Sequence, residues 1–143
     1  MPTLAETDDE IARCFDVMVE LRPHLQRAAF VSQVRNMQAE GFRLAYLEEN
    51  AEVACVAGFR IATNLAFGRH LYIDDLVTAE RARSRGLGDI MLAWLRALAV
   101  DQGCRVLNLD SGTQRQQAHK FYFRHGLVIA AFHFYQPLPE GTA

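Results

Sequence analysis

Arg83-Ser84-Arg85-Gly86-Leu87-Gly88 is the stretch of this sequence that says most about the fold. It separates an apolar run, residues 71–78, from an amphipathic run, residues 87–102. Glycine lets the backbone approach a ligand closely, and the first turn of a helix has N–H groups without internal partners and a partial positive charge. Arginines at positions 81, 83 and 85 add positive potential. Together these features predict a strand, a turn that binds a pyrophosphate, and a helix.

Two other kinds of phosphate-binding loop fit this stretch less well. A Walker A loop needs Gly-Lys-Ser/Thr, which is absent from the sequence. A dinucleotide-binding turn needs G-x-G-x-x-G, and Met91 stands where the third glycine belongs. A tight turn without a ligand is the remaining alternative, and the combination of glycines, arginines and position favours the anion-binding interpretation over it.

The sequence after the turn predicts alternating helices and strands. Residues 87–102 form a strong amphipathic pattern with apolar residues at helical spacing, namely Leu87, Ile90, Met91, Trp94, Leu95 and Leu98. Residues 105–110 predict another strand, residues 114–125 another helix that Gly126 ends, and residues 127–136 a last strand. A strand–helix–strand unit implies a right-handed crossover between parallel strands.

The sequence before the turn predicts two helices and a hairpin. Thr7 and Glu10 form a capping-box pattern, and apolar residues follow at helical spacing until Pro23 breaks the helix and opens a second one over residues 23–40. Strands over residues 42–48 and 52–61 flank a hairpin turn at Asn50-Ala51. The fold class is therefore α/β, with a mixed central sheet flanked by helices. The 143 residues contain no linker or repeat, so we expect one domain over 1–143.

With these elements in place, the sequence resembles the GNAT N-acetyltransferase family. Arg83, Gly86 and Gly88 match its signature Gln/Arg-x-x-Gly-x-Gly/Ala between a strand and a helix. A second signature, Asn-x-x-Ala-x-x-Phe-Tyr-x-x-x-Gly-Phe, is matched at Ala118, Phe121, Tyr122 and Gly126. Arg115 replaces its asparagine, so a coenzyme or thiol contact made there is expected to differ, and Leu127 replaces its last phenylalanine. The motifs cover residues 70–126, the order of elements covers nearly the whole chain, and the resemblance implies the single-domain GNAT fold.

This resemblance implies acetyl-CoA as the co-substrate and assigns residues to it. Backbone amides of the glycine turn would bind the pyrophosphate, and the strand before it would pair with the pantetheine arm and supply N–H donors near Leu76 and Val77 to the oxyanion. Tyr122 would act as general acid for the departing thiolate, with a role as a core aromatic as the alternative. The implied coenzyme-binding residues are Leu76, Val77, Thr78, Arg83, Ser84, Arg85, Gly86, Leu87, Gly88, Asp89 and Ser111.

Asp74 and Asp75 interrupt an otherwise apolar strand. Adjacent strand residues point to opposite faces, so the two carboxylates cannot act side by side unless a bulge intervenes. A buried carboxylate needs a partner, and in this family the strand ends in the cleft where acceptor and thioester meet. There a carboxylate can attract an ammonium group and, through water, remove its proton. Both are therefore candidate catalytic residues, and structural hydrogen-bond acceptors are the alternative.

Composition limits the remaining options. Residues 1–80 carry 13 acidic and 7 basic residues, and residues 81–126 carry 3 and 8, which suits an anionic coenzyme beside a cationic acceptor. The widely spaced Cys14, Cys55 and Cys104 predict buried, reduced thiols, and no histidine pair has metal-ligand spacing, so we expect no metal. We expect a cytoplasmic protein without a membrane or nucleic-acid partner.

The sequence thus predicts an N-acetyltransferase acting by direct attack in a ternary complex on a small cationic amine or a lysine-like acceptor. Two alternatives stay open: a module that binds acetyl-CoA without turnover, and an enzyme that acetylates proteins. The C-terminal strands must either compress a hairpin into residues 127–136 or be completed by another subunit, which would make a homodimer.

Overall fold

The computed structural model describes residues 1–140 of the chain. It forms two compact units, Met1–Leu109 and Asp110–Ala143, and each is described by itself. The first unit holds the whole sheet and four of the helices, and the second holds one helix and the C-terminal segment. One domain over residues 1–143 stays a prediction, and its last three residues lie outside the described part of the chain.

Five strands form one sheet in the order β1-β2-β3-β4-β5. The first four pair antiparallel, and β4 and β5 pair parallel, so the expected mixed sheet is confirmed. The strands are β1 (Thr3–Leu4), β2 (Phe42–Glu49), β3 (Glu52–Asn64), β4 (Gly68–Thr78) and β5 (Val106–Leu109). The first of these was not predicted, because two residues are too few to show an alternating pattern.

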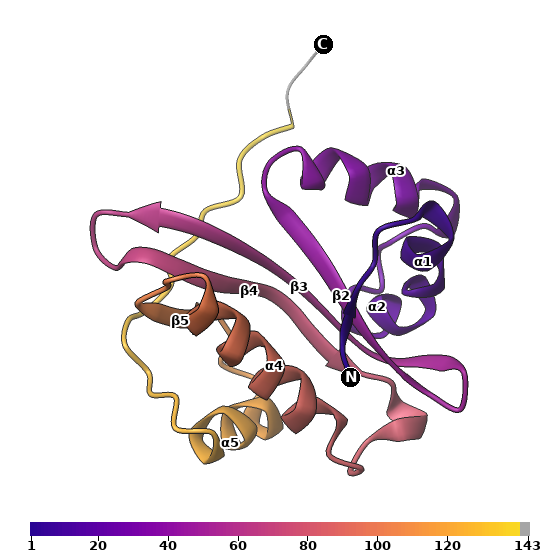
Figure 1. Cartoon of the computed structure of the whole chain (residues 1–143). Helices are drawn as coiled ribbons and strands as arrows, with labels where there is room; N and C mark the ends of the chain where they lie inside the picture. The colour runs from indigo at the N-terminus through magenta and orange to yellow at the C-terminus, as the bar shows by residue number, and fades with distance from the viewer. Residues whose placement is uncertain (141–143) are drawn as a thin grey trace. The chain divides into compact units, whose positions relative to one another are not determined.

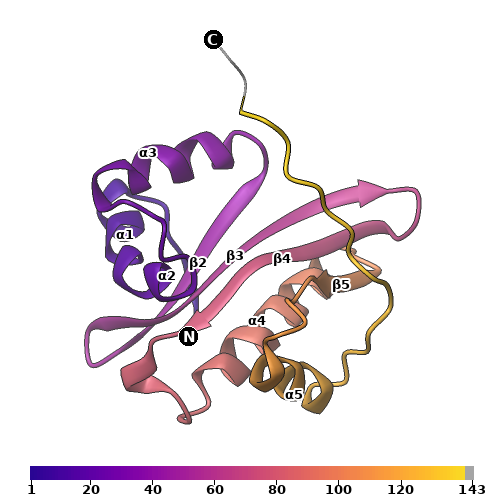
Figure 2. The ribbon, with the colours of Figure 1, turned by 180° about the vertical axis from the view of Figure 1, so that it is seen from behind.

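Helices cover both faces of the sheet in the first unit. Three of them, α1 (Asp8–Arg13), α2 (Phe15–Leu21) and α3 (Arg27–Gln38), lie on one side of the strands, and α4 (Leu87–Asp101) lies on the other (Figures 1 and 2). Every residue of β3 from Val53 to Phe59 except Gly58 is an apolar side chain with at most 6% exposure. Both faces of β3 are therefore covered, one by each of the two helix layers.

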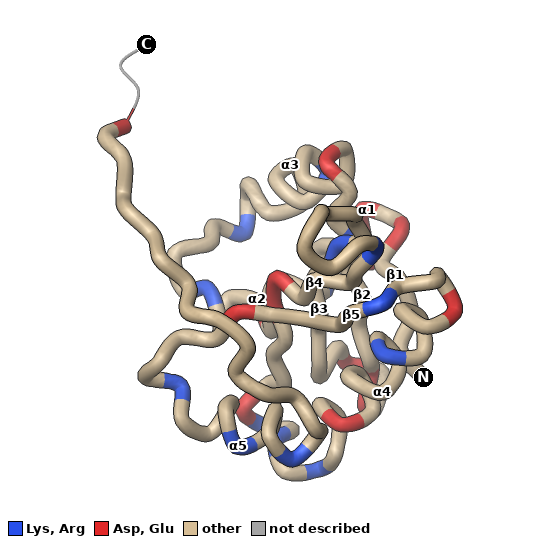
Figure 3. Tube along the Cα trace, turned by 90° about the vertical axis from the view of Figure 1, so that its left-hand side faces the viewer, with Lys and Arg blue, Asp and Glu red and all other residues tan. Residues whose placement is uncertain are grey.

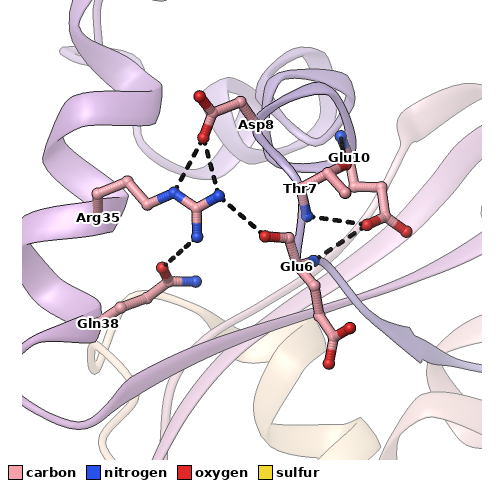
Figure 4. Close-up of polar contacts among 6 residues, drawn as sticks. All are labelled: Glu6, Thr7, Asp8, Glu10, Arg35 and Gln38. Carbon is pink, nitrogen blue, oxygen red and sulfur yellow. Dashed lines mark hydrogen bonds and ion pairs between the residues drawn. The ribbon is translucent and has the colours of Figure 1, made fainter.

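The predicted capping box begins α1, and an arginine of α3 holds this helix start against α3. Thr7 N–H donates to Glu10 Oε1 at 2.9 Å, and Glu10 N–H donates to Thr7 Oγ1 at 3.1 Å. Backbone N–H donors hold the pKa of the Glu10 carboxyl down to about 2. Arg35 of α3 donates to Asp8 Oδ1 and, at 2.9 Å, to the carbonyl of Glu6, so one guanidinium joins the two helices (Figure 4).

The N-terminal helices differ from the prediction in their bounds. The first helix is split at Cys14, whose N–H donates to the carbonyl of Ile11 while its Sγ donates to the carbonyl of Glu10 at 3.4 Å. The thiol thus takes the carbonyl that a regular helix would offer to the Cys14 N–H. The next helix begins after Gln26, not at Pro23, because Pro23 lies in a turn closed by Leu25 N–H and the carbonyl of Arg22.

The predicted hairpin is confirmed, and the predicted last strand is wrong. Asn50 and Ala51 have φ of 55° and 65°, the left-handed pair that a type I′ turn requires. Within the described residues after Gly126 the structure has no strand, although residues 127–136 have strand composition. Composition is not sufficient for a strand, since a strand exists only where a neighbour completes its hydrogen-bond ladder.

Candidate functional site

The candidate site begins at the point where the pairing between β4 and β5 ends. Their parallel pairing runs from His70↔Val106 to Ile73↔Leu109 and stops there, while β4 continues to Thr78 beside β3. Residues 74–78 of β4 therefore have one edge without a strand partner among residues 1–140. Leu76, Val77 and Thr78, the residues for which the sequence predicts contact with the pantetheine arm, lie in this stretch.

The pairing with β3 decides which backbone groups face that opening. Ala79 N–H donates to the carbonyl of Ala54 at 2.7 Å, which makes this a hydrogen-bonded pair. Bonded and non-bonded pairs alternate in an antiparallel ladder, so Val77 also faces β3, whereas Leu76 and Thr78 face the opening. Arg83 Nε donates to the carbonyl of Thr78 at 3.4 Å, which agrees with a Thr78 carbonyl that points away from β3. Of the two expected oxyanion donors, only Leu76 has its N–H on the open side.

A β-bulge lies at the start of the opening. Gly58 of β3 pairs with Asp75 and the next residue, Phe59, pairs with Ile73, so Asp74 is the extra residue. The bulge removes the strict alternation that would send the two carboxylates to opposite faces. Gly58 is required opposite it, because a Cβ there would lie 2.7 Å from Asp75 Oδ2 and 2.5 Å from the Phe42 ring.

Two arginines hold the two carboxylates in different ways. Arg22, which follows α2, donates from Nε to Asp75 Oδ1 at 2.9 Å and from Nη2 to the carbonyl of Asp74 at 3.0 Å, so it clamps the bulge. Arg60 of β3 donates from Nε to Asp74 Oδ2 at 3.0 Å. The Asp74 and Asp75 side chains are 20% and 12% exposed. Both are structurally held, as a carboxylate inside an apolar strand needs to be.

Asp74 nevertheless keeps one oxygen unsatisfied. Its Oδ1 is buried and accepts no hydrogen bond from any described residue. Burial raises the pKa of Asp74, and the charge of Asp75 adds to this, while the hydrogen bond and charge of Arg60 act against it. A carboxylate with a raised pKa and a vacant acceptor position has the properties of a base or an ammonium-binding group.

The glycine turn forms the predicted helix start. Ser84 and Gly86 have φ of 66° and 78°, and Gly86 is the N-cap of α4 without a side-chain cap. The first helical hydrogen bond runs from Ile90 N–H to the carbonyl of Gly86 at 3.1 Å, so N–H groups of the first turn, such as those of Leu87 and Gly88, have no acceptor within the helix. This is the arrangement that binds anions at helix N-termini.

The arginines of the turn are less available than the sequence suggested. Arg81 lies 3.4 Å from Glu52 Oε2 and donates to the carbonyl of Val53, and Arg85 pairs with Glu49. Both therefore contact acidic residues of the β2–β3 hairpin, and Arg83 is the arginine directed to the β4 edge. Figure 3 shows residues of both charges along the traced chain. Backbone N–H groups thus remain the main anion-binding feature of the turn.

The second unit contains the other predicted site residues. Tyr122 lies in α5 (Gln116–Arg124), and burial raises the pKa of its phenol while the charge of Arg115 opposes this shift. Arg115 is the N-cap of α5 but makes no side-chain cap. Ser111 is half-buried. Oδ1 of Asp110 lies 3.5 Å from Nδ1 of His133.

Sequence reasoning missed Arg22 and Arg60 as partners of the acid pair. They lie 53 and 14 residues from the carboxylates they bind, so no local spacing connects them. Gly58 was the available signal, because glycine inside a strand often marks a bulge or a close approach. Cys14 and Cys55 are buried as expected, and burial raises their pKa to about 12 and about 11. The third cysteine, Cys104, was also expected to be buried but is only half-buried. In residues 1–140 there is no group of three potential metal ligands and no helix able to cross a membrane.

Comparison with known sequences gives a family and two relatives. A model described as the acetyltransferase (GNAT) family matches residues 5–127. The uncharacterized N-acetyltransferase YhdJ of Bacillus subtilis strain 168 is 32% identical over 132 residues, which are 91% of this chain and 93% of that protein. The aminoalkylphosphonate N-acetyltransferase of Salmonella typhimurium is 32% identical over 66 residues, 46% of this chain and 43% of that protein.

Comparison with solved structures agrees on the fold. AAC(6')-Iy, solved with the bisubstrate analogue CoA-S-monomethyl-acetylneamine, superposes with a TM-score of 0.81, and the match covers 97% of this chain and 99% of that one. The identity is 13%, so the likeness concerns the fold and not the substrate.

Proposed function

This chain belongs to the GNAT family of acetyltransferases, and on that basis we propose that it transfers acetyl from acetyl-CoA to a primary amine. The acceptor is a small cationic amine or a lysine-like group, and it attacks the thioester directly in a ternary complex. The amine nitrogen forms a bond to the thioester carbonyl carbon, and the carbon–sulfur bond breaks. Before it attacks, the ammonium group of the acceptor loses one proton to a base. The nitrogen loses a second proton after attack, and this loss balances the proton with which coenzyme A leaves on sulfur.

The observation that carries this proposal is the open edge of β4 beside the glycine turn. The edge at residues 74–78 offers backbone groups of Leu76 and Thr78 to the pantetheine arm, and the first turn of α4 offers N–H groups to the pyrophosphate. We assign the oxyanion contact to the Leu76 N–H, because a positioned backbone donor stabilises the negative oxygen that forms during attack. A protein of the same fold binds a bisubstrate analogue that contains CoA, which supports this use of the fold.

The acid pair supports a cationic acceptor. We assign the base, or the ammonium-binding group, to Asp74, because its Oδ1 has no hydrogen-bond partner in the described chain and its pKa is raised. Asp75 differs, because its Oδ1 accepts a hydrogen bond from Arg22 and its Oδ2 packs closely against the backbone of Gly58. Asp75 therefore positions the bulge, and Asp74 meets the substrate.

The leaving group needs a proton donor. We assign this role to Tyr122, which matches the family's helix tyrosine and whose raised pKa keeps the phenol protonated. Arg115 stands where the family has asparagine, so the hydrogen bonds around the thiol are expected to differ from those of typical members.

The test is an acetyl-CoA-dependent thiol-release assay across a panel of diamines, polyamines, amino acids, amino sugars and lysine-containing peptides. We expect turnover with cationic amines, a rate that rises with pH as the amine loses its proton, and a KM that rises with salt. Turnover only with anionic amino acids or phosphorylated sugars would contradict the assignment of Asp74. Turnover only with peptides would indicate a protein acetyltransferase. Stabilisation by acetyl-CoA without any turnover would indicate a binding module.

A further inference from the structure

The two arginines that bind the acid pair have hydrogen-bond donors to spare. A guanidinium carries five N–H donors in a fixed plane. Arg60 uses its Nε alone, to Asp74 Oδ2 at 3.0 Å, and Arg22 uses Nε and Nη2. Among residues 1–140 no group accepts a hydrogen bond from either Nη of Arg60 or from Nη1 of Arg22. Asp74 Oδ1 is the one buried side-chain atom without a partner in this part of the chain, so the unpaired Nη atoms are open to solvent.

Arg60 is also held in a defined orientation. Its Cζ lies 5.5 Å from the centroid of the Phe42 ring, as in a cation–π contact, while its Nε is bound to Asp74. Phe42 is itself buried, and its ring packs so closely on the backbone of Gly58 that no Cβ would fit between them. Because the ring and the carboxylate both fix the guanidinium, little side-chain freedom is left to lose when its outer N–H groups bind a ligand.

The charges of this cluster indicate what a ligand has to supply. The guanidinium groups of Arg22 and Arg60 already balance the carboxylates of Asp74 and Asp75. An acceptor that brought only a positive charge would leave the partly buried cluster with an excess cation beside unpaired N–H donors, which is unfavourable away from bulk water. An acceptor that carries a carboxylate as well as an amine restores the balance, and its oxygens match the donors left unused.

We propose that the Nη groups of Arg60 form a subsite for a carboxylate, and that the acceptor is an amine that carries one, such as a free basic amino acid, in place of a simple diamine or polyamine. Arg22, bound to the carbonyl of the neighbouring Asp74, adds positive charge beside this subsite. The amine then lies at Asp74 Oδ1 and the carboxylate at Arg60, on either side of one ion pair. A planar carboxylate pairs with two parallel N–H groups of a guanidinium, which an ammonium group cannot offer. This inference rests on the proposed acetyl transfer and adds a second functional group to the acceptor.

The first experiment compares acceptors that differ only in the carboxylate. Lysine, ornithine and 6-aminohexanoate are each paired with their decarboxylated counterparts, cadaverine, putrescine and pentylamine, in the thiol-release assay at saturating acetyl-CoA. In the pair with the highest turnover, kcat/KM should favour the carboxylate member at least about ten-fold, because a site built to hydrogen-bond a group discriminates against an analogue that lacks it. Equal or better turnover of the decarboxylated members would overturn the proposal.

A substitution then assigns this preference to Arg60. Arg60→Lys keeps a charge beside Asp74 but loses the paired N–H groups, so the kcat/KM ratio within the best pair should fall about ten-fold, mainly through the KM of the carboxylate member. The ratio remains informative even where the variant lowers both rates through Asp74. The matched control is Arg43→Lys in β2, because Arg43 also lies over an aromatic ring, that of Phe59 at 5.6 Å, but binds no carboxylate in the described chain. A ratio unchanged in Arg60→Lys, or lowered equally in Arg43→Lys, would refute the role of Arg60.

A binding measurement separates this inference from the proposed function. Isothermal titration calorimetry of the same six compounds, with and without CoA, follows binding without turnover. The carboxylate member of the best pair should bind wild type at least about ten-fold more tightly, and Arg60→Lys should lose that difference. If this difference is found but no amine is acetylated, acetyl transfer fails and the carboxylate subsite stands. If amines are acetylated without such a difference, or if none of the six compounds binds, the subsite is wrong.

Discussion

Asp74→Asn and Asp75→Asn should have opposite effects, because the two neighbouring carboxylates have different surroundings. Asp75 accepts a charge-assisted hydrogen bond from Arg22 at 2.9 Å and is 12% exposed, whereas the Arg22 side chain is 43% exposed. Hydrogen bonds to charged groups contribute about 1.5–3 kcal/mol, and the exposure of Arg22 reduces this. We therefore expect Asp75→Asn to cost about 1–2 kcal/mol of unfolding free energy.

In a thermal melt this cost lowers the Tm by roughly 3–8 °C for a chain of this size. Because Asp75 does not meet the substrate in our proposal, kcat with the best amine should fall less than about three-fold at a temperature where the variant is folded. Asp74→Asn should show the reverse. Its Tm should stay within about 2 °C of wild type, since the buried, unsatisfied Oδ1 charge disappears together with the Arg60 ion pair. Its kcat/KM should fall at least about 100-fold, the usual minimum for a positioned base.

The pH dependence provides an independent test of the same assignment. Asp74 must be ionised to act, and burial raises its pKa, so the acidic limb of kcat/KM should lie above the ordinary aspartate range and disappear in Asp74→Asn. Because the raised pKa means that folding disfavours the carboxylate, this group's contribution to stability is greatest at low pH and is lost as pH rises through that pKa. Full activity in Asp74→Asn, or a loss of activity only in Asp75→Asn, would refute the reasoning.

Three further predictions concern the glycine turn, the general acid and the hairpin. Acetyl-CoA should raise the Tm of the wild type, and Gly86→Val should abolish that rise, because Gly86 has a φ of 78° at the N-terminus of α4; an equal rise in the variant would remove the turn from the coenzyme site. Tyr122→Phe should lower kcat about ten-fold or more with little change in acetyl-CoA affinity, and unchanged turnover would leave Tyr122 a packing residue. Ala51→Gly should raise the unfolding free energy by about 1 kcal/mol in a denaturant titration, since Ala51 has a φ of 65° where glycine is unstrained, and Ala57→Gly in β3 should instead lower it.

The sequence was most informative where structure depends on neighbours along the chain. The Thr7 capping box, the Asn50-Ala51 turn and the Gly86 helix start are set by residues only a few positions apart, and the structure has all three. The split at Cys14 is also local, but it depends on a thiol that competes for one carbonyl, which apolar spacing does not reveal. The sequence therefore predicted which segments are helical more accurately than the residues at which each helix begins and ends.

Contacts across the fold could not be predicted in the same way. The aspartate pair was identified as unusual because two acids interrupt an apolar strand, yet the arginines that hold it come from the end of α2 and from β3. The strand expected over residues 127–136 failed for a related reason. Its composition favours a strand, but the described residues of one chain supply no ladder partner for it.

The acid pair and the open edge of β4 have a common physical origin. Ile73 is the last residue of β4 that pairs on both sides, and the bulged residue Asp74 follows it directly. A bulge bends its strand and increases the local twist, so the part of β4 beyond Asp74 turns away from a parallel neighbour that has no bulge. One inserted residue therefore ends the pairing with β5, places a carboxylate at the end of the opening, and leaves the Leu76 N–H facing it. Arg22 keeps this geometry by binding the backbone and the side chain of the bulge together. In our proposal the chemistry at this edge therefore depends on the register of β3 against β4, which Gly58 permits, and not only on the two acids that the sequence displays.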